Sequence, residues 1–446
     1  MLDTDGRLAK RYKRLVVSHL SNAQVLAAGL HSLPALTQSF AATQAAWRFL
    51  NNENVTLPKL AGPLLSCARD DIPISCDRWL LVALDWTLLN FTKHVSKSDR
   101  IKLASVGALG YKLLTALAIN DREGLPLAPL CLELHADNGV HSTRADKPLK
   151  MSSALDGLAP VMAHVCDAAL GKKPVFIIDR DADSVGHYRH WSKEGRHFLI
   201  RADDNRLVLH EGKQRRLIDL VKPLKKNNEF SESRTVDFKG TPATQFTAET
   251  LVVLHRPART HRQNRRTGKI TRTSISGIHL PLRLIISEIR DARGKVLTRW
   301  MLMSNLPAEV KAATISLWYF WRWRIESYHK LLKGAGQQVE CWQQETPEAF
   351  ARRLTVAAMA CVLVWRLARD KTPRAAETRE LLVRLSGRQI KRGKNRPGFT
   401  EPALLAGLGI LVPMLLILEQ YDPDELRRMA RELLPLILPE TNTPGP

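Results

Sequence analysis

The sequence predicts an α/β protein with helical segments at both ends and a β-rich stretch inside it, on three observations. Short apolar runs at 79–86, 174–178 and 197–201 alternate with amphipathic segments, which is typical of a mixed α/β sheet. Residues 203–299 are instead rich in Thr, Val, Lys and Arg and contain strand-like runs. Helical periodicity dominates before residue 70 and resumes after residue 300.

The two ends of the chain are expected to be helical domains. In residues 1–70 a basic helix runs to the break at Pro34, and a second helix begins near Ser39. Such a domain suits DNA binding, and on composition it suits a plain helical scaffold equally well. Residues 346–446 are expected to form a C-terminal helical domain that dimerises. Its apolar run, residues 403–418, is expected to be a buried helical hairpin rather than a membrane span.

The central core is expected to combine residues 71–202 with residues 300–345. Its first strand ends at Asp85 and another strand ends just before Asp179. Two further strands flank Glu123-Gly124, a dipeptide typical of a hairpin turn. The expected order along this part of the chain is strand (79–86), two hairpin strands (114–120 and 127–136), helix (155–170), strand (174–178), helix (183–194) and strand (197–201).

The β-rich insertion, residues 203–299, contains strand-like runs at 248–256 and 280–289 around a charged loop, residues 256–272. The loop holds seven basic residues, namely Arg256, Arg259, Arg262, Arg265, Arg266, Lys269 and Arg272. It is either a solvated hairpin tip or an arm that follows nucleic-acid phosphates, and we favour the arm.

The composition favours a polyanionic partner. The formal net charge is +23, with 67 Lys and Arg against 44 Asp and Glu. Nucleic acid fits this excess best, ahead of a ribosomal or membrane-surface role. The six cysteines include no C-x-x-C spacing, which excludes the common zinc motifs. No signal peptide pattern opens the chain, so a cytoplasmic, nucleoid-associated protein with no membrane partner is expected.

One expected helix gathers an unusual set of charges. On an α-helix Tyr319, Arg322, Glu326 and Lys333 fall within roughly 60° of one another over about 21 Å of axis, and Lys330 lies on the same stripe. A solvated helix usually scatters such charges or pairs them at i,i+4. A carboxylate among an aromatic hydroxyl and three cations indicates metal and phosphate chemistry.

The two strand-end aspartates extend this hypothesis. Ligand sites in α/β sheets gather beyond the carboxyl ends of strands, where Asp85 and Asp179 could meet Glu326. Three hard oxygen ligands suit Mg²⁺, and two ions about 3.5–4 Å apart can activate the attacking oxygen and stabilise the leaving one. Taken alone, each aspartate is more often a helix cap or a salt-bridge partner. Asp179, Asp181 and Asp183 also resemble the start of a calcium loop, but its Gly and final Glu are missing.

With these residues in place, the chain resembles the DDE transposases of the insertion-sequence-four group, which includes the transposon-five transposase. The resemblance rests on RWRIESYHK, FIIDRDADS, ALDWT and AAWRFLNNENV, and it covers nearly the whole chain. It implies an RNase-H-like core and Asp85, Asp179 and Glu326 as catalytic metal ligands. It also implies DNA contacts from Tyr319, Arg322, Lys333, Arg180, Arg201 and Trp300, the last by stacking on a displaced base. The alternative for Trp300 is a plain core residue. Lys330, on the same helical stripe, is expected to join the DNA contacts.

The resemblance implies a cut-and-paste DNA transposase that uses two Mg²⁺ ions, with Mn²⁺ as a possible substitute. Its partners would be double-stranded DNA, both the element's terminal inverted repeats and target DNA, and a second copy of the chain in a synaptic homodimer. Trp86 and Asp181 depart from the group's usual residues. Two alternatives stay open, a metal-dependent nuclease that does not join ends and a DNA-binding repressor without catalysis.

Overall fold

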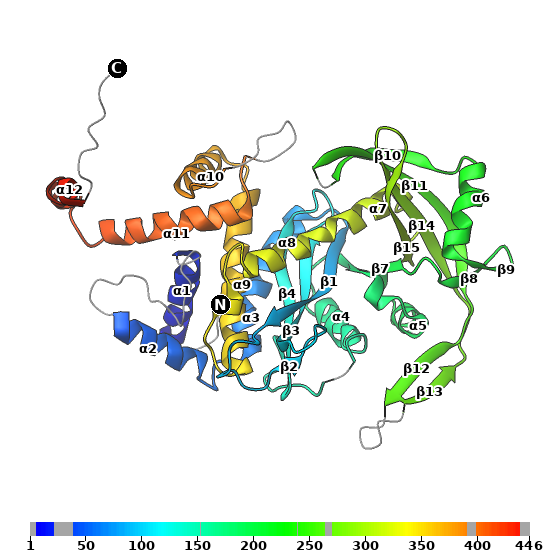
Figure 1. Cartoon of the computed structure of the whole chain (residues 1–446), viewed down its shortest axis with the longest axis horizontal. Helices are drawn as coiled ribbons and strands as arrows, with labels where there is room; N and C mark the ends of the chain where they lie inside the picture. The colour runs from blue at the N-terminus through cyan, green and yellow to red at the C-terminus, as the bar shows by residue number, and fades with distance from the viewer. Residues whose placement is uncertain are drawn as a thin grey trace.

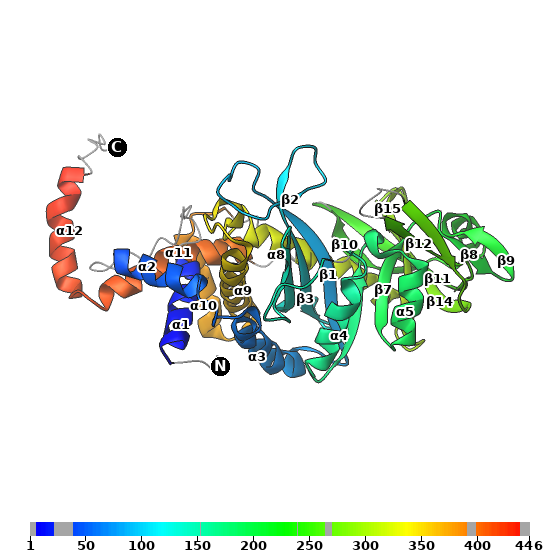
Figure 2. The ribbon, with the colours of Figure 1, turned by 90° about the horizontal axis from the view of Figure 1, so that it is seen from below.

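The computed structural model describes residues 6–21, 39–151, 153–238, 240–263, 270–389 and 398–437. It is elongated, with a large mixed sheet in the middle, a helical lobe on one side and a β-rich region on the other (Figure 1). The fold is therefore mixed α/β, as the sequence predicts. Figure 2 shows the same three parts after a quarter turn.

Within the described ranges thirteen strands form the large sheet, in the order β5-β4-β3-β1-β6-β7-β15-β14-β11-β8-β9, with β2 paired to β3 and β10 to β11. A separate hairpin joins β12 to β13. The strands of the core are β1 (Trp79–Asn90), β2 (Ile101–Lys102), β3 (Leu109–Asn120), β4 (Pro126–Ala136), β5 (Gly139–Ser142), β6 (Lys173–Ile178) and β7 (His197–Ala202). Those that follow are β8 (Leu207–His210), β9 (Lys213–Arg216), β10 (Ser231–Phe238), β11 (Thr241–Leu254), β12 (Ala258–Gln263), β13 (Ile270–Ile275), β14 (Leu280–Arg290) and β15 (Val296–Ser304).

The strand directions divide the sheet. β1 is antiparallel to β3 but parallel to β6, and β6 is parallel to β7. From β15 onward the path β15-β14-β11-β8-β9 is antiparallel. Because β15 pairs with β7, the strands of the expected insertion continue the core sheet. The strand order and the hairpin at Gly124 (φ +66°) confirm the predicted core elements, although β1 runs past Asp85 to Asn90.

The helices are α1 (Gly6–Ser21), α2 (Ser39–Leu50), α3 (Leu57–Ser75), α4 (Leu158–Asp167), α5 (Val185–Lys193), α6 (Val221–Lys226), α7 (Ala312–Trp321), α8 (Trp323–Leu332), α9 (Pro347–Arg369), α10 (Pro373–Leu385), α11 (Glu401–Leu418) and α12 (Pro423–Ile437). Helices α3 and α9 pack on β4, and α1 packs on α9 and α11. Helix α8 lies against β1 and β3. The apolar sequence of α9 is buried along most of its length, which makes it the central helix of the lobe.

One expectation about a helix is wrong. α11 is one helix through Pro413, and its second half is only partly buried, so it is not a buried hairpin. Within the described residues it is the one helix long and apolar enough to cross a membrane, and 28% of it is buried. The basic loop at 256–272 is a hairpin between β12 and β13, but its tip, residues 264–269, lies outside the described residues.

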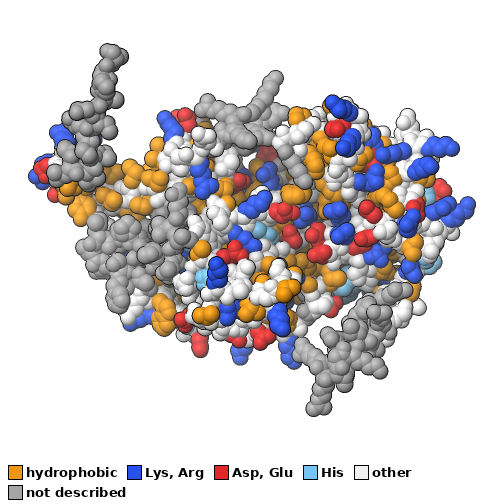
Figure 3. All heavy atoms as spheres, viewed as in Figure 1, with side chains coloured by type: hydrophobic (Ala, Val, Ile, Leu, Met, Phe, Trp, Pro, Cys, Tyr) orange, Lys and Arg blue, Asp and Glu red, His pale blue; other side chains and the backbone are white. Residues whose placement is uncertain are grey.

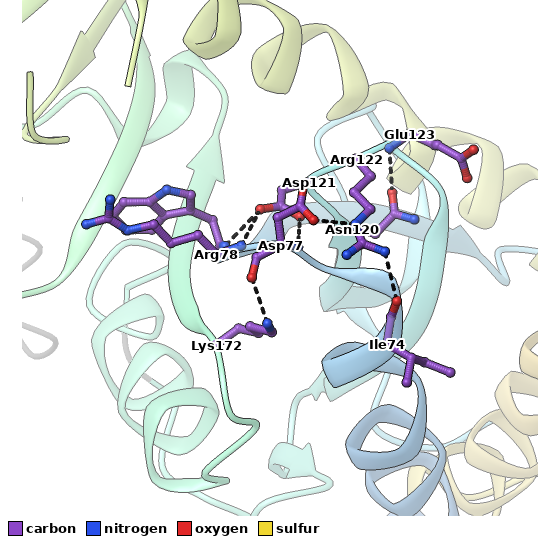
Figure 4. Close-up of polar contacts among 9 residues, drawn as sticks. Ile74, Asp77, Arg78, Asn120, Asp121, Arg122, Glu123 and Lys172 are labelled. Atoms are coloured by element: carbon purple, nitrogen blue, oxygen red, sulfur yellow. Dashed lines mark hydrogen bonds and ion pairs between the residues drawn. The ribbon is translucent and has the colours of Figure 1, made fainter. Parts of the chain in front are cut away.

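The start of β1 is fixed by a single carboxylate (Figure 4). Asp121, in the turn after β3, accepts backbone N–H bonds from Asp77 (2.7 Å), Arg78 (3.1 Å) and Trp79 (2.8 Å). Lys172, just before β6, donates to the carbonyl of Asp77 at 2.6 Å. These bonds set the relative position of β1, β3 and β6. They therefore also fix the far ends of β1 and β6, where the candidate site lies.

Candidate active site

The two strand aspartates lie side by side. β1 and β6 are parallel, and their register pairs Leu84 with Ile178, so Asp85 and Asp179 are the next residues on adjacent strands. The Asp85 carboxylate accepts the N–H of Trp86 at 2.8 Å. The Asp179 carboxylate accepts the N–H of Asp181 at 3.0 Å and so caps the short turn that follows β6. Each carboxylate is held by its own backbone.

Arg322 joins these strands to the third carboxylate. Its guanidinium lies 3.4 Å from Asp85 Oδ2 and 3.1 Å from Glu326 Oε1. The side chain of Arg322 is only 8% exposed, and burial strengthens both interactions. The Arg322 guanidinium thus lies between the Asp85 carboxylate of β1 and the Glu326 carboxylate of α8.

The predicted continuous helix is wrong in one respect. The chain forms two helices, α7 and α8, that meet at Arg322. Arg322 keeps a right-handed helical conformation (φ −49°, ψ −31°), so Tyr319 still lies near it and the guanidinium stands 5.6 Å from the Tyr319 ring. Lys333 follows the end of α8 rather than lying inside it.

Burial disfavours the ionised form of the Asp85 carboxylate. Desolvation raises the pKa of Asp85 to about 6, although Arg322 acts in the opposite direction. The neighbouring charges of Asp179 and Glu326 add to the increase. Burial also raises the pKa of Tyr319. A cation beside the Asp85 carboxylate would favour its ionised form over its protonated form.

The two lysines of the predicted stripe separate. Lys333 Nζ donates to the carbonyl of Leu88 at 2.6 Å, which places it along β1 a few residues beyond Asp85. Lys330 is exposed and lines a different cavity, of about 170 Å³, with Arg324, Ser327 and residues of α11. The described contacts do not join Lys330 to the three carboxylates, so the helical stripe overestimates how closely the lysines gather.

Trp300 is buried rather than displayed. It is 5% exposed, and its ring packs edge-on against Tyr319 at 5.2 Å and lies tilted against Phe320 at 6.4 Å. Trp300 thus packs from β15 against α7, which is the core role considered for it above. Stacking on a DNA base requires these rings to move, and that role stays a prediction.

The turn after β6 carries a clamp that sequence reasoning missed. Arg206 Nε donates to both carboxylate oxygens of Asp183, at 3.0 and 3.1 Å, and the backbone N–H of Asp203 donates to the same carboxylate at 2.9 Å. The predicted DNA-contacting residues Arg180 and Arg201 flank this clamp, and Arg180 is 61% exposed beside Asp203. No spacing in the sequence joins Asp183 to Arg206, so this contact could not be predicted from it.

The residue types at the site fit divalent cations, but Arg322 now lies between two of the carboxylates. Within the described ranges no group of three His, Cys, Asp or Glu is close enough to bind a metal ion as it stands. The Arg322 guanidinium occupies the space between the carboxylates of Asp85 and Glu326. A second cavity, of about 490 Å³, is lined by Arg78, Lys172 and Lys173 at the opposite end of β1 and β6, away from the carboxylates.

Comparison with known families decides the class of this protein. Residues 80–363, more than half of the chain, match the family model described as transposase DDE domain. The chain is a DDE transposase. Residues 4–55 match a second family, transposase DNA-binding, which assigns the N-terminal lobe to DNA rather than to a plain scaffold. A search of curated proteins found no match. The protein is thus an enzyme that acts on DNA.

Proposed function

We propose that this DDE transposase belongs to the insertion-sequence-four group and moves its element by cut-and-paste. The observation that carries the proposal is the convergence of Asp85, Asp179 and Glu326 around Arg322. An RNase-H-like core is supported by the order β3-β1-β6-β7, with one antiparallel neighbour and then two parallel strands.

Asp85, Asp179 and Glu326 would hold the divalent ions, Mg²⁺ by preference. Their hard oxygen donors and the raised pKa of Asp85 support this assignment. When bound, two such ions lower the pKa of water and stabilise the charge of attacking and leaving oxygens. The three carboxylates approach one another on separate elements, so their position depends on how β1, β6 and α8 pack.

The chain's other polar residues would hold the DNA. Arg322, released from Asp85 and Glu326, is placed to accept a phosphate in exchange for the carboxylates. Lys333 lies along β1 and would bind a neighbouring phosphate. Arg180 and Arg201 would bind the strand that passes the turn after β6, and Lys330 a more distant phosphate. Tyr319 supports Arg322 through its ring.

The reaction proceeds by phosphoryl transfer. Water attacks a phosphodiester at the element's end, the P–O3′ bond breaks, and a 3′-OH leaves. That hydroxyl then attacks the opposite strand, which closes a hairpin on the element's end and releases the 3′-OH of the donor flank. A second water hydrolyses the hairpin bond and frees the element's 3′-OH again. This hydroxyl finally attacks a phosphodiester of target DNA, joins to it and releases a 3′-OH of the target. Positioning and charge stabilisation supply the rate enhancement, with no covalent protein intermediate.

We assign the parts of the chain accordingly. Residues 1–70 bind the element's terminal repeats, 71–202 with 300–345 form the catalytic core, 203–299 form the insertion, and 346–446 join two copies in the synaptic homodimer. The exposed apolar residues of α11 and α12, including Met414, Leu415, Leu418 and Leu433, support the last assignment. The enzyme would act on DNA in the cytoplasm.

The test uses purified wild-type protein, DNA that carries the element's two ends, and Mg²⁺. Glu326→Gln should abolish both cleavage and joining while terminal-repeat binding persists. The matched control is Glu123→Gln, which removes an exposed carboxylate paired with Lys371 and should leave both steps unchanged. Cleavage without joined product would identify a nuclease, binding without cleavage would identify a repressor, and cleavage by Glu326→Gln would contradict the assigned site.

A further inference from the structure

The outer edge of the large sheet is strongly basic. β9 is the last strand in the sheet order, its four side chains are exposed, and α6 follows it closely in the chain. Residues 207–228 hold six Lys and Arg against two acidic residues. Figure 3 shows Lys and Arg gathered at this end of the molecule, over α6 and β8–β9 in Figure 1.

Four of these cations lack an acidic partner. Arg216 pairs with Asp219 at 2.9 Å, and Lys225 pairs with the buried Glu288 at 3.0 Å. In the part of the chain that the structure describes, the remaining cations make no ion pair. Arg215 interacts electrostatically with Asp219 but forms no ion pair with it. We call these four residues, Lys213, Arg215, Lys222 and Lys226, the edge patch.

Their spacing suits a repeating anion. Lys213 and Arg215 alternate along β9 and therefore point to the same face. Lys222 and Lys226 are four residues apart on α6 and share one side of that helix. Lysines on an edge strand also prevent sheet-to-sheet aggregation. That role does not account for the second pair, which lies on a helix.

The edge patch and the DNA-binding lobe lie on opposite sides of the catalytic carboxylates. The lobe packs against β4 through α9, whereas β9 is six strands beyond β6 in the other direction. At about 4.8 Å between strands, the patch is roughly 30 Å from the strand that ends before Asp179. Figure 1 shows this order, with α1 and α2 at one end and β9 at the other.

The edge patch therefore lies where a duplex would continue past the cut if it were held by the lobe, cut at the carboxylates and extended along the sheet. Beyond the cut lies donor DNA that flanks the element, and its sequence differs at every insertion site. The protein can hold such DNA only through its backbone. Unpaired Lys and Arg are the side chains for this task, because each neutralised phosphate releases counterions.

We propose that the edge patch binds the phosphate backbone of the donor flank. At 3.4 Å per base pair, the contact begins roughly 9 base pairs beyond the cut if the flank runs straight along the sheet. This inference rests on the proposed function, since it requires the cut to occur at Asp85, Asp179 and Glu326.

The experiment measures binding without divalent ions, so that no cleavage occurs. Probes carry the element's terminal repeat with a donor flank of either 4 or 20 base pairs. Wild type should bind the long-flank probe more tightly. Lys213→Gln with Arg215→Gln, and separately Lys222→Gln with Lys226→Gln, should each weaken long-flank binding about tenfold and leave short-flank binding unchanged. The control, Lys371→Gln with Arg384→Gln, removes exposed cations that are already ion-paired.

Each other outcome has a definite meaning. Equal loss on both probes, or no effect of flank length in wild type, overturns the inference. A separate joining assay uses Mg²⁺, pre-cut ends and target DNA; variants that lose only this joining also overturn the inference, because the patch would then bind target DNA. Wild type that binds no terminal repeat at any flank length contradicts the proposed function itself. Thermal melting of the variants checks that these exposed substitutions leave the fold intact.

Discussion

Arg322 and the edge patch differ in the source of the negative charge that balances them. Arg322 is 8% exposed and lies between the carboxylates of Asp85 and Glu326. The edge patch is exposed and has no carboxylate of its own. Arg322 is therefore placed before any DNA arrives, whereas the edge patch stays solvated until an external anion reaches it. A buried, paired cation determines geometry; an exposed, unpaired one mainly contributes affinity.

The largest expected effect comes from removing Arg322. Arg322→Ala should lower the cleavage rate by about 10²–10³-fold, as for other preorganised charge stabilisers. The carboxylates of Asp85, Asp179 and Glu326 would then face one another without a counter-charge. The variant should melt at a lower temperature, and Mg²⁺ should raise its melting temperature more than that of wild type.

Single-turnover cleavage and thermal melting with and without Mg²⁺ test this prediction. Arg324→Ala is the matched control, because Arg324 is the adjacent arginine on α8 and donates to the Gly124 carbonyl, away from the site. An Arg322→Ala protein that cleaves at the wild-type rate would show that the pairing seen here is not part of catalysis.

A smaller effect is expected from the clamp behind Asp179. Asp183→Asn weakens the hold on Arg206 and on the N–H of Asp203, so the turn that Asp179 caps should loosen. By analogy with other residues that orient metal ligands, metal affinity or cleavage should fall about 10–100-fold. The Mg²⁺ concentration for half-maximal cleavage should rise while terminal-repeat affinity is unchanged. Asp156→Asn, which removes an exposed partner of His187, is the control; an unchanged Mg²⁺ dependence would count against a positioning role.

The aspartates of the site were predictable because their signal is local. Each follows a short run of buried apolar residues, and parallel neighbours place such positions at one edge of a sheet. The break at Arg322 was not predictable. Its backbone remains helical and no Gly or Pro stands beside it, so periodicity cannot distinguish one helix from two. The position of Lys333 followed from that assumption of a single helix.

Long-range polar contacts and edge strands left no comparable signal. Asp183 and Arg206 are 23 residues apart, and no spacing rule joins them. The β9 sequence KQRR has no apolar alternation, because an edge strand with four exposed side chains buries nothing. The net charge of +23 predicts a polyanionic partner but does not show which cations are unpaired. That distinction requires the positions of Asp219 and Glu288.

The smallest expected effect uses salt to separate Arg322 from the edge patch. The Debye length falls from roughly 14 Å at 0.05 M to about 7 Å at 0.2 M salt, which screens exposed charges but hardly affects buried pairs. The affinity advantage of a 20-base-pair flank should therefore disappear over this range. The slope of log affinity against log salt should decrease by roughly 0.9 for each edge-patch contact removed. Single-turnover cleavage of DNA already bound at saturating protein should change less than about twofold, because Arg322 is shielded from solvent. Much slower cutting of bound DNA at high salt would mean that Arg322 is as accessible to salt ions as the edge patch. The distinction between a buried, paired cation and exposed, unpaired ones would then be wrong.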